Sequence, residues 1–150
     1  MRSESIKRNM PILFKKFITR KEVQDNCGLA WYVFGDNVEG KGLGGQAKEM
    51  RGESNSIGIP TKFAPGTNTR DYFYDSLYIK VIFQYFSSPL IRIENILSWD
   101  DGGIIVWPAD GLGTNRAELK TRAPKLKLFL DDALEYFVSE YGTIDELPSS

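Results

Sequence analysis

Continuous apolar runs alternate along the chain with segments of helical periodicity. The two clearest runs, at residues 29–34 and 103–107, have the unbroken apolar pattern that is typical of strands buried on both faces. Shorter strands are predicted at residues 12–18 and 56–60. Strands that alternate with helices form a mostly parallel or mixed sheet covered on both faces, so the pattern predicts an α/β fold.

Helices are expected between these strands. Thr19 and Glu22 have the spacing of a capping box, in which the hydroxyl and the carboxylate satisfy backbone N–H groups at the start of a short helix. Asn26 and Gly28 then mark the end of that helix. Further helical segments are predicted at residues 46–51, over most of residues 72–99 with a break at Ser87-Ser88-Pro89, and in a closing helix with apolar positions from Leu126 to Phe137.

The length and composition are those of one ordinary globular domain. The chain has 150 residues, of which 41% are hydrophobic and 26% are charged. No internal repeat or long linker divides it, so we expect residues 1–150 to form a single domain with its core within residues 12–140. The 19 basic and 20 acidic side chains give a net charge of −1, which differs from the basic surface of a nucleic-acid-binding domain.

Two residue counts limit the chemistry. The chain has no histidine, which excludes Ser–His and Cys–His nucleophile pairs and leaves only oxygen ligands for a metal. The single cysteine, Cys27, forms no intramolecular disulfide and fits a reducing compartment. No apolar stretch approaches the roughly 20 residues of a membrane span, and the amino terminus lacks a signal-peptide core. We therefore expect a cytoplasmic protein with no membrane partner, no metal and no resident cofactor.

Glycine-rich or polar loops follow three of the predicted strands, at residues 35–45, 60–62 and 110–115. Sheets of this kind bind ligands beyond the carboxyl ends of their strands, which places the three loops at one edge. Glycines let the backbone approach a ligand and present N–H groups to an anion, and a helix N-terminus adds its dipole. Two such loops that face each other would hold a diphosphate. The alternative is that the glycines only form tight turns.

Three short motifs, in the same order along the chain, resemble the macrodomain family. Phe34-Gly35-Asp36-Asn37 precedes Gly44-Gly45-Gln46-Ala47, and a later strand with Trp107-Pro108 precedes Gly111-Leu112-Gly113. Between them, residues 57–62 resemble the strand-Thr-Lys segment of the branch that removes ADP-ribose from acidic residues of proteins or from DNA bases. The resemblance implies a three-layer fold, with a mixed sheet flanked by helices, that binds ADP-ribose.

The resemblance also implies roles for individual residues. Asn37 would bind the distal ribose, Lys62 would attack or position its anomeric carbon, and Asp110 is a candidate for the assisting acid. The ligand would further contact residues of the three loops, namely Asp36, Gly44, Gly45, Gln46, Thr61, Gly111, Leu112, Gly113, Thr114 and Asn115.

The sequence departs from the family pattern at two places. Asn115 stands where the related hydrolases tend to have an Asp, which leaves Asp110 or Asp36 as the candidate acid. Thr19-Arg20-Lys21 replaces the Asp that reads the adenine amine in that family, and Asp25 is a weak substitute, so the sequence does not identify the group that recognises adenine.

These observations support three hypotheses. The first is an ADP-ribosyl glycohydrolase, or an enzyme that processes ADP-ribose-1″-phosphate. The second is a non-catalytic module that reads ADP-ribose on a modified macromolecule or sequesters a nucleotide derived from NAD. The third is a small structural or interaction domain whose glycines serve turns only.

Overall fold

A computed structural model describes residues 11–99, 102–114 and 117–148. Five strands form one sheet in the order β3-β2-β4-β1-β5. Their bounds are Ile12–Lys15 (β1), Ala30–Asn37 (β2), Ser56–Lys62 (β3), Ile104–Pro108 (β4) and Thr143–Ile144 (β5). The fold is α/β, as predicted.

All strand pairings of this sheet are parallel, so the expectation of a mixed sheet is wrong. The physical reason is the connectivity. Each of β1 to β4 is followed by at least one helix before the next strand begins, and these helical connections return the chain to the edge where that strand starts, as parallel pairing requires.

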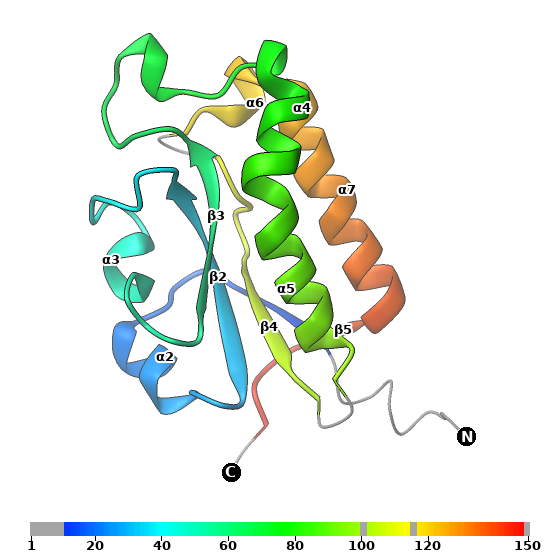
Figure 1. Ribbon diagram of the computed structural model, residues 1–150. Coiled ribbons are helices and arrows are strands. Elements are labelled where there is room, and N and C mark those ends of the chain that lie inside the picture. Colours follow the sequence, from blue (N-terminus) through cyan, green and yellow to red (C-terminus); the bar gives the residue numbers. More distant parts are fainter. Residues whose placement is uncertain (1–10, 100–101, 115–116, 149–150) are drawn as a thin grey trace.

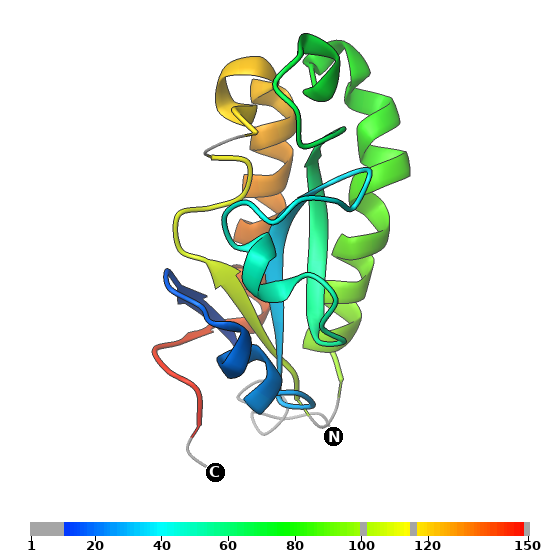
Figure 2. The same cartoon turned by 90° about the vertical axis from the view of Figure 1, so that its left-hand side faces the viewer.

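Helices cover both faces of the sheet (Figures 1 and 2). One face carries two short helices, α2 (Arg20–Asp25) and α3 (Ala47–Met50). The other face carries α4 (Tyr78–Val81), α5 (Ser87–Leu97), α6 (Leu119–Arg122) and α7 (Pro124–Tyr141). Two buried apolar clusters fill the spaces between these layers. Within the described residues, no helix combines the length and the hydropathy that crossing a membrane requires.

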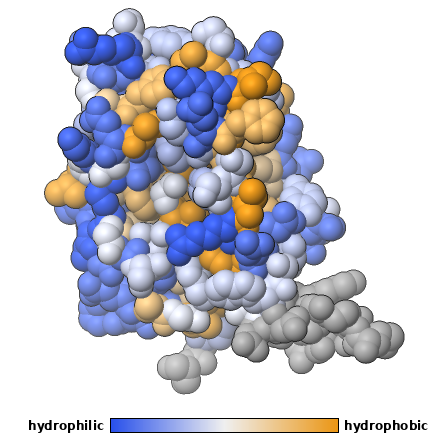
Figure 3. Space-filling model, in the orientation of Figure 1, coloured by the Kyte–Doolittle hydropathy of each residue, from blue (hydrophilic) through white to orange (hydrophobic). Residues whose placement is uncertain are grey.

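The helix predicted across residues 72–99 is continuous from Tyr78 to Leu97, so the expected break at Ser87-Ser88-Pro89 is wrong. Residues Ile82–Phe86 form a π-helical segment between α4 and α5. Pro89 has no N–H to donate, and the wide turn ends three residues before it, within the turn of helix whose regular bonding pattern the proline interrupts. Figure 3, in the same orientation as Figure 1, shows hydrophobic and hydrophilic side chains intermixed on the face of the molecule toward the viewer.

The predicted capping box is half formed. Thr19 Oγ1 accepts a hydrogen bond from the Glu22 backbone N–H at 3.2 Å, as expected. The Glu22 carboxylate does not return this bond. It accepts instead from Lys15 Nζ at 2.8 Å and from the Tyr32 hydroxyl at 3.0 Å. Glu22 thereby links α2 to strands β1 and β2. Burial of the Tyr32 side chain, together with the Glu22 carboxylate, raises the pKa of Tyr32.

Because β2, β3 and β4 are parallel, their carboxyl ends lie at the same edge of the sheet. The glycine-rich loops that follow β2 and β4 therefore begin at that edge.

Candidate functional site

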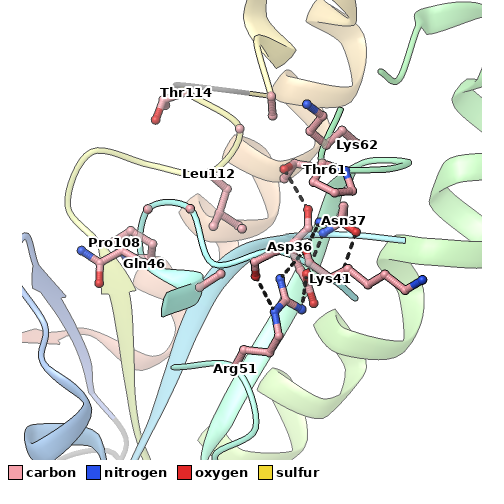
Figure 4. Close-up of a pocket in the computed structure, with 18 of the residues that line it drawn as sticks. Asp36, Asn37, Lys41, Gln46, Arg51, Thr61, Lys62, Pro108, Leu112 and Thr114 are labelled. Carbon is pink, nitrogen blue, oxygen red and sulfur yellow. Dashed lines mark hydrogen bonds and ion pairs between the residues drawn. The ribbon is translucent and has the colours of Figure 1, made fainter. Parts of the chain in front are cut away.

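A cleft of about 470 Å³ lies at the carboxyl edge of the sheet (Figure 4). Its lining residues come from the ends of β2 and β3 and from the loops after β2 and β4, namely Gly35, Asp36, Asn37, Lys41, Gly42, Gly44, Gly45, Gln46, Ala47, Arg51, Thr61, Lys62, Pro65, Pro108, Gly111, Leu112, Gly113, Thr114 and Ala117. The two glycine-rich loops thus face one shared space, at the edge where parallel sheets bind ligands.

Most of the residues predicted for the site line this cleft. They are Asp36, Asn37, Gly44, Gly45, Gln46, Thr61, Lys62, Gly111, Leu112, Gly113 and Thr114. Asp110 is exposed and is not part of the lining, because it lies in a turn that the Gly111 N–H closes by donating to Pro108 O at 2.9 Å. Asn115 lies outside the described residues.

Arg51 is a cleft residue that the sequence reasoning missed. Its guanidinium makes an ion pair with Asp36, with Nη1 2.7 Å from Oδ1. Nε donates to Gly42 O at 3.0 Å, and Nη2 donates to Lys41 O at 3.2 Å. One side chain therefore ties the first glycine loop to the end of β2. The signal in the sequence was Asp36 itself, a carboxylate that directly follows an apolar strand and needs a cation nearby.

Asn37 closes the start of the same loop. Its Nδ2 donates to Lys41 O at 2.7 Å, and the Lys41 N–H donates to Asn37 Oδ1 at 3.4 Å. The side chain is buried. Both ends of the amide are therefore engaged by the backbone of one residue, and Asn37 and Arg51 share the Lys41 carbonyl as an acceptor.

Glycine is required at two positions of the cleft walls. Gly45 has a φ of +58° and Gly113 a φ of +71°, both in the left-handed region that side chains rarely adopt. At Gly113 a Cβ would also lie 2.7 Å from Leu119 Cβ, which leaves no space for one, whereas nothing lies within 4 Å of a Cβ at Gly45. The loop after β4 is thus pressed against the start of α6.

Lys62 lies at the end of β3 and is buried, with 6% of the residue exposed. Its Nζ donates to Gly66 O at 2.7 Å and lies 4.3 Å from the centroid of the Tyr72 ring. The guanidinium of Arg122 lies 3.8 Å from the same centroid. Two cations therefore approach one aromatic ring, whose negative face attracts both.

Cations outnumber carboxylates among the described lining residues. Lys41, Arg51 and Lys62 face a single carboxylate, Asp36, which Arg51 already neutralises. Backbone N–H groups of glycine-rich loops favour anions in the same way. No group of three or more Cys, Asp or Glu side chains within the described ranges could hold a metal ion. The charge of the cleft suits an anionic ligand such as a phosphate ester.

Comparison with known proteins gives one family. Residues 13–133 match the family described as a family of unknown function, DUF7831. No curated protein and no solved structure matches the chain. The match covers strands β1 to β4, both cleft loops and most of α7. The chain belongs to the DUF7831 family.

Proposed function

We propose that the chain binds ADP-ribose or an ADP-ribosyl derivative in the cleft, with the diphosphate between the two glycine-rich loops. The observation that carries this proposal is that Gly44, Gly45, Gly111 and Gly113 line one cleft together with Lys62 and Asn37. These are the residues for which the macrodomain resemblance implies contacts with the diphosphate and the distal ribose.

Hydrogen bonds between the cleft and a diphosphate are sufficient for micromolar affinity. Hydrogen bonds to a charged phosphate contribute about 1.5–3 kcal/mol each. Several of them, reduced by the cost of immobilising the ligand, give a dissociation constant near 1 μM, which corresponds to about −8 kcal/mol. The cationic excess in the cleft adds attraction at a distance.

Hydrolysis of an ADP-ribosyl bond is the activity that Lys62 supports. In this reaction water adds across the bond between the anomeric carbon and the modified group, which leaves as a carboxylic acid, a base or a phosphate. Lys62 attacks or positions the anomeric carbon. A lysine that acts as a nucleophile must lose its proton before it attacks.

One observation favours a binding module instead. Asp36, the carboxylate that lines the cleft in the described part of the chain, is held by Arg51, and Asp110 is exposed outside the cleft. A protein that reads ADP-ribose on a macromolecule, or that sequesters a nucleotide derived from NAD, requires the two loops and no acid.

The first experiment is a thermal-shift measurement with ADP-ribose, ADP-ribose-1″-phosphate and NAD. A ligand at a hundred times its dissociation constant stabilises the folded state by about 2.7 kcal/mol, which raises the melting temperature measurably. If none of these ligands shifts the melting temperature, the cleft does not bind this class and the proposal is wrong.

Lys62→Met separates the enzyme from the binding module. Methionine retains an apolar stem without the amine. For an enzyme we expect affinity for ADP-ribose within a few fold of the parent, and a loss of turnover of about a hundredfold or more on ADP-ribosylated protein, ADP-ribosylated DNA or the 1″-phosphate. If the parent protein binds ADP-ribose but releases no product from any of the three substrates, the binding module is correct.

A further inference from the structure

The Lys62 ammonium is held in part by the segment that follows its own strand. Residues 63–71 leave β3 and return to it, so that Lys62 and Tyr72 form an isolated antiparallel bridge. Two groups of this returning segment contact the amine, namely the Gly66 carbonyl, which accepts from Nζ at 2.7 Å, and the Tyr72 ring, whose centroid lies 4.3 Å from Nζ. The position of the ring therefore influences where the amine lies.

The Tyr72 ring is buried and is itself held by Arg122, the last residue of α6. The Arg122 guanidinium lies 3.8 Å from the ring centroid, well within the range of a cation–π interaction. Its Nη1 donates to the Tyr74 hydroxyl at 2.8 Å, and its Nε donates to Glu118 Oε1 at 3.1 Å. Because these bonds orient the guanidinium, the ring has a fixed neighbour on the side of α6.

Helix α6 is also attached to the second glycine loop. The Leu119 N–H donates to Gly113 O at 2.9 Å, and the Leu119 side chain occupies the space that a Cβ at Gly113 would need. Arg122 lies three residues further along the same four-residue helix. A continuous series of contacts therefore leads from Gly113 through α6 and Tyr72 to the Lys62 amine.

We infer that Tyr72 and Arg122 are positioning residues: the Tyr72 ring, held by Arg122, places the Lys62 amine at the cleft, and α6 couples this placement to the second glycine loop. Neither residue is among those that line the cleft, so both act through Lys62. The inference rests on the proposed function, because this placement serves an ADP-ribosyl ligand whose anomeric carbon lies next to the amine.

Proton–carbon NMR of protein labelled with ¹³C at the lysine Cε measures this placement without any turnover. Protons above an aromatic ring resonate upfield of their usual position. The Lys62 Hε signal, identified by its loss in Lys62→Met, should therefore lie upfield of the signal of the exposed Lys120. Tyr72→Leu should move the Lys62 signal to the position of Lys120. Tyr72→Phe, which keeps the ring, should leave it upfield.

Arg122→Met tests the second contact. Removal of the guanidinium leaves the ring without its fixed neighbour, so the upfield shift of the Lys62 signal should decrease. Lys120→Met is the matched control, because it removes an exposed cation from the same helix and should leave the Lys62 signal in place. Equal effects of the two variants would remove Arg122 from the arrangement.

Two glycine variants test the coupling through α6 in the ligand-free protein. Gly113→Ala presses a Cβ against Leu119 and should move the Lys62 signal, whereas Gly45→Ala, whose Cβ meets open space in the first loop, should not. Leu119→Ala, which removes the contact instead of compressing it, gives the same test where Gly113→Ala does not fold. An unchanged Lys62 signal in the folded variant would contradict the coupling.

Turnover provides a second readout. A displacement of about 1 Å at a reacting group costs about a hundredfold in rate, so for an enzyme we expect Tyr72→Leu to lower kcat by about 10–100-fold. KM should stay within about threefold, because the diphosphate contacts are unchanged. Tyr72→Phe should keep both constants near those of the parent. A raised KM with an unchanged kcat in Tyr72→Leu would show that the ring contributes to binding and does not position the amine.

The outcomes separate the two proposals. If the parent protein does not bind ADP-ribose, the proposed function fails, while the NMR signals still report whether Tyr72 and Arg122 position the amine. If the parent binds ADP-ribose but Tyr72→Leu and Arg122→Met leave the Lys62 signal unchanged, only the positioning role fails.

Discussion

Among single residues, Arg51 determines how the first glycine loop is held. We predict that Arg51→Met destabilises the protein by about 1–3 kcal/mol, because it leaves the half-buried Asp36 carboxylate without its cation. It should also weaken ADP-ribose binding by about tenfold, because the Gly42 carbonyl loses its donor and the Lys41 carbonyl keeps only the one from Asn37. Urea denaturation and calorimetry measure the two effects.

The double variant Arg51→Met with Asp36→Asn is the control for charge. It removes the unpaired carboxylate and should recover part of the stability, but not the affinity. If Arg51→Met binds ADP-ribose as tightly as the parent protein, the loop does not need this anchor.

Tyr32 provides a test by pH. Burial and the Glu22 carboxylate raise its pKa above the usual value near 10, so the folded protein keeps a proton that the unfolded chain loses above pH 10. The contribution is therefore fully present below pH 10 and declines as the pH rises above it. We predict that the unfolding free energy falls less steeply above pH 10 in Tyr32→Phe than in the parent, as measured by urea denaturation. Parallel curves would contradict this reading.

Among individual residues, the sequence predicted those that belong to a recognisable local motif. Asn37 and Lys62 were recognisable because each stands at the end of a strand in a distinctive motif. Arg51 was missed because its partners, Asp36 and two loop carbonyls, are brought to it only by tertiary folding. Among the described residues, Gln46 Oε1 is buried and accepts no hydrogen bond, which also depends on packing and has no sequence signature.

At the level of elements, the two glycine loops differ in how tightly they are packed. Gly113→Ala should cost about 2–4 kcal/mol, because it combines left-handed strain with overlap against Leu119. Gly45→Ala adds strain alone, since its Cβ would meet open space, and should cost about 1–2 kcal/mol. The denaturation midpoints of the two variants measure these costs. A smaller cost for Gly113→Ala than for Gly45→Ala would show that the loop after β4 can move away from Leu119.

The elements themselves were largely predictable, and the errors have physical causes. Continuous apolar runs identified β2 and β4, which are mostly buried, and β3 was predicted as a further short strand. The two-residue strand β5 is too short to leave a pattern. Pro89 was expected to end a helix, but the π-helical segment before it accommodates the missing N–H. Strand direction is set by the connecting helices, which hydrophobic periodicity alone does not reveal.

Considered as a whole, the molecule is a parallel sheet between two helical layers, with its cleft at the carboxyl edge. The sheet brings together three loops that are far apart in sequence. Each loop by itself resembles a tight turn, but together the loops line one cleft. Strand ends fix the floor of the cleft, and Arg51 and Leu119 fix its walls.

Gly35 offers the most direct test of a ligand in this cleft. It lies on the floor, within β2, and a Cβ there would lie 3.6 Å from Thr61 Oγ1 and 4.0 Å from the Gly113 N, which are ordinary contacts. A Cβ at this position therefore fits without a clash, and Gly35→Val extends a larger side chain from it over the floor of the cleft, at a strand position that suits valine. Gly35→Ala should melt at or above the temperature of the parent protein, and the melting temperature of Gly35→Val checks that this variant is folded.

The decisive measurement is calorimetric titration of the parent protein and of Gly35→Val with ADP-ribose. We predict a dissociation constant on the order of 1 μM for the parent protein and a loss of affinity of at least about tenfold in Gly35→Val, with Gly35→Ala between them. No binding heat with the parent protein, or equal affinity in Gly35→Val, would contradict the claim that the cleft between the two glycine loops holds the ligand.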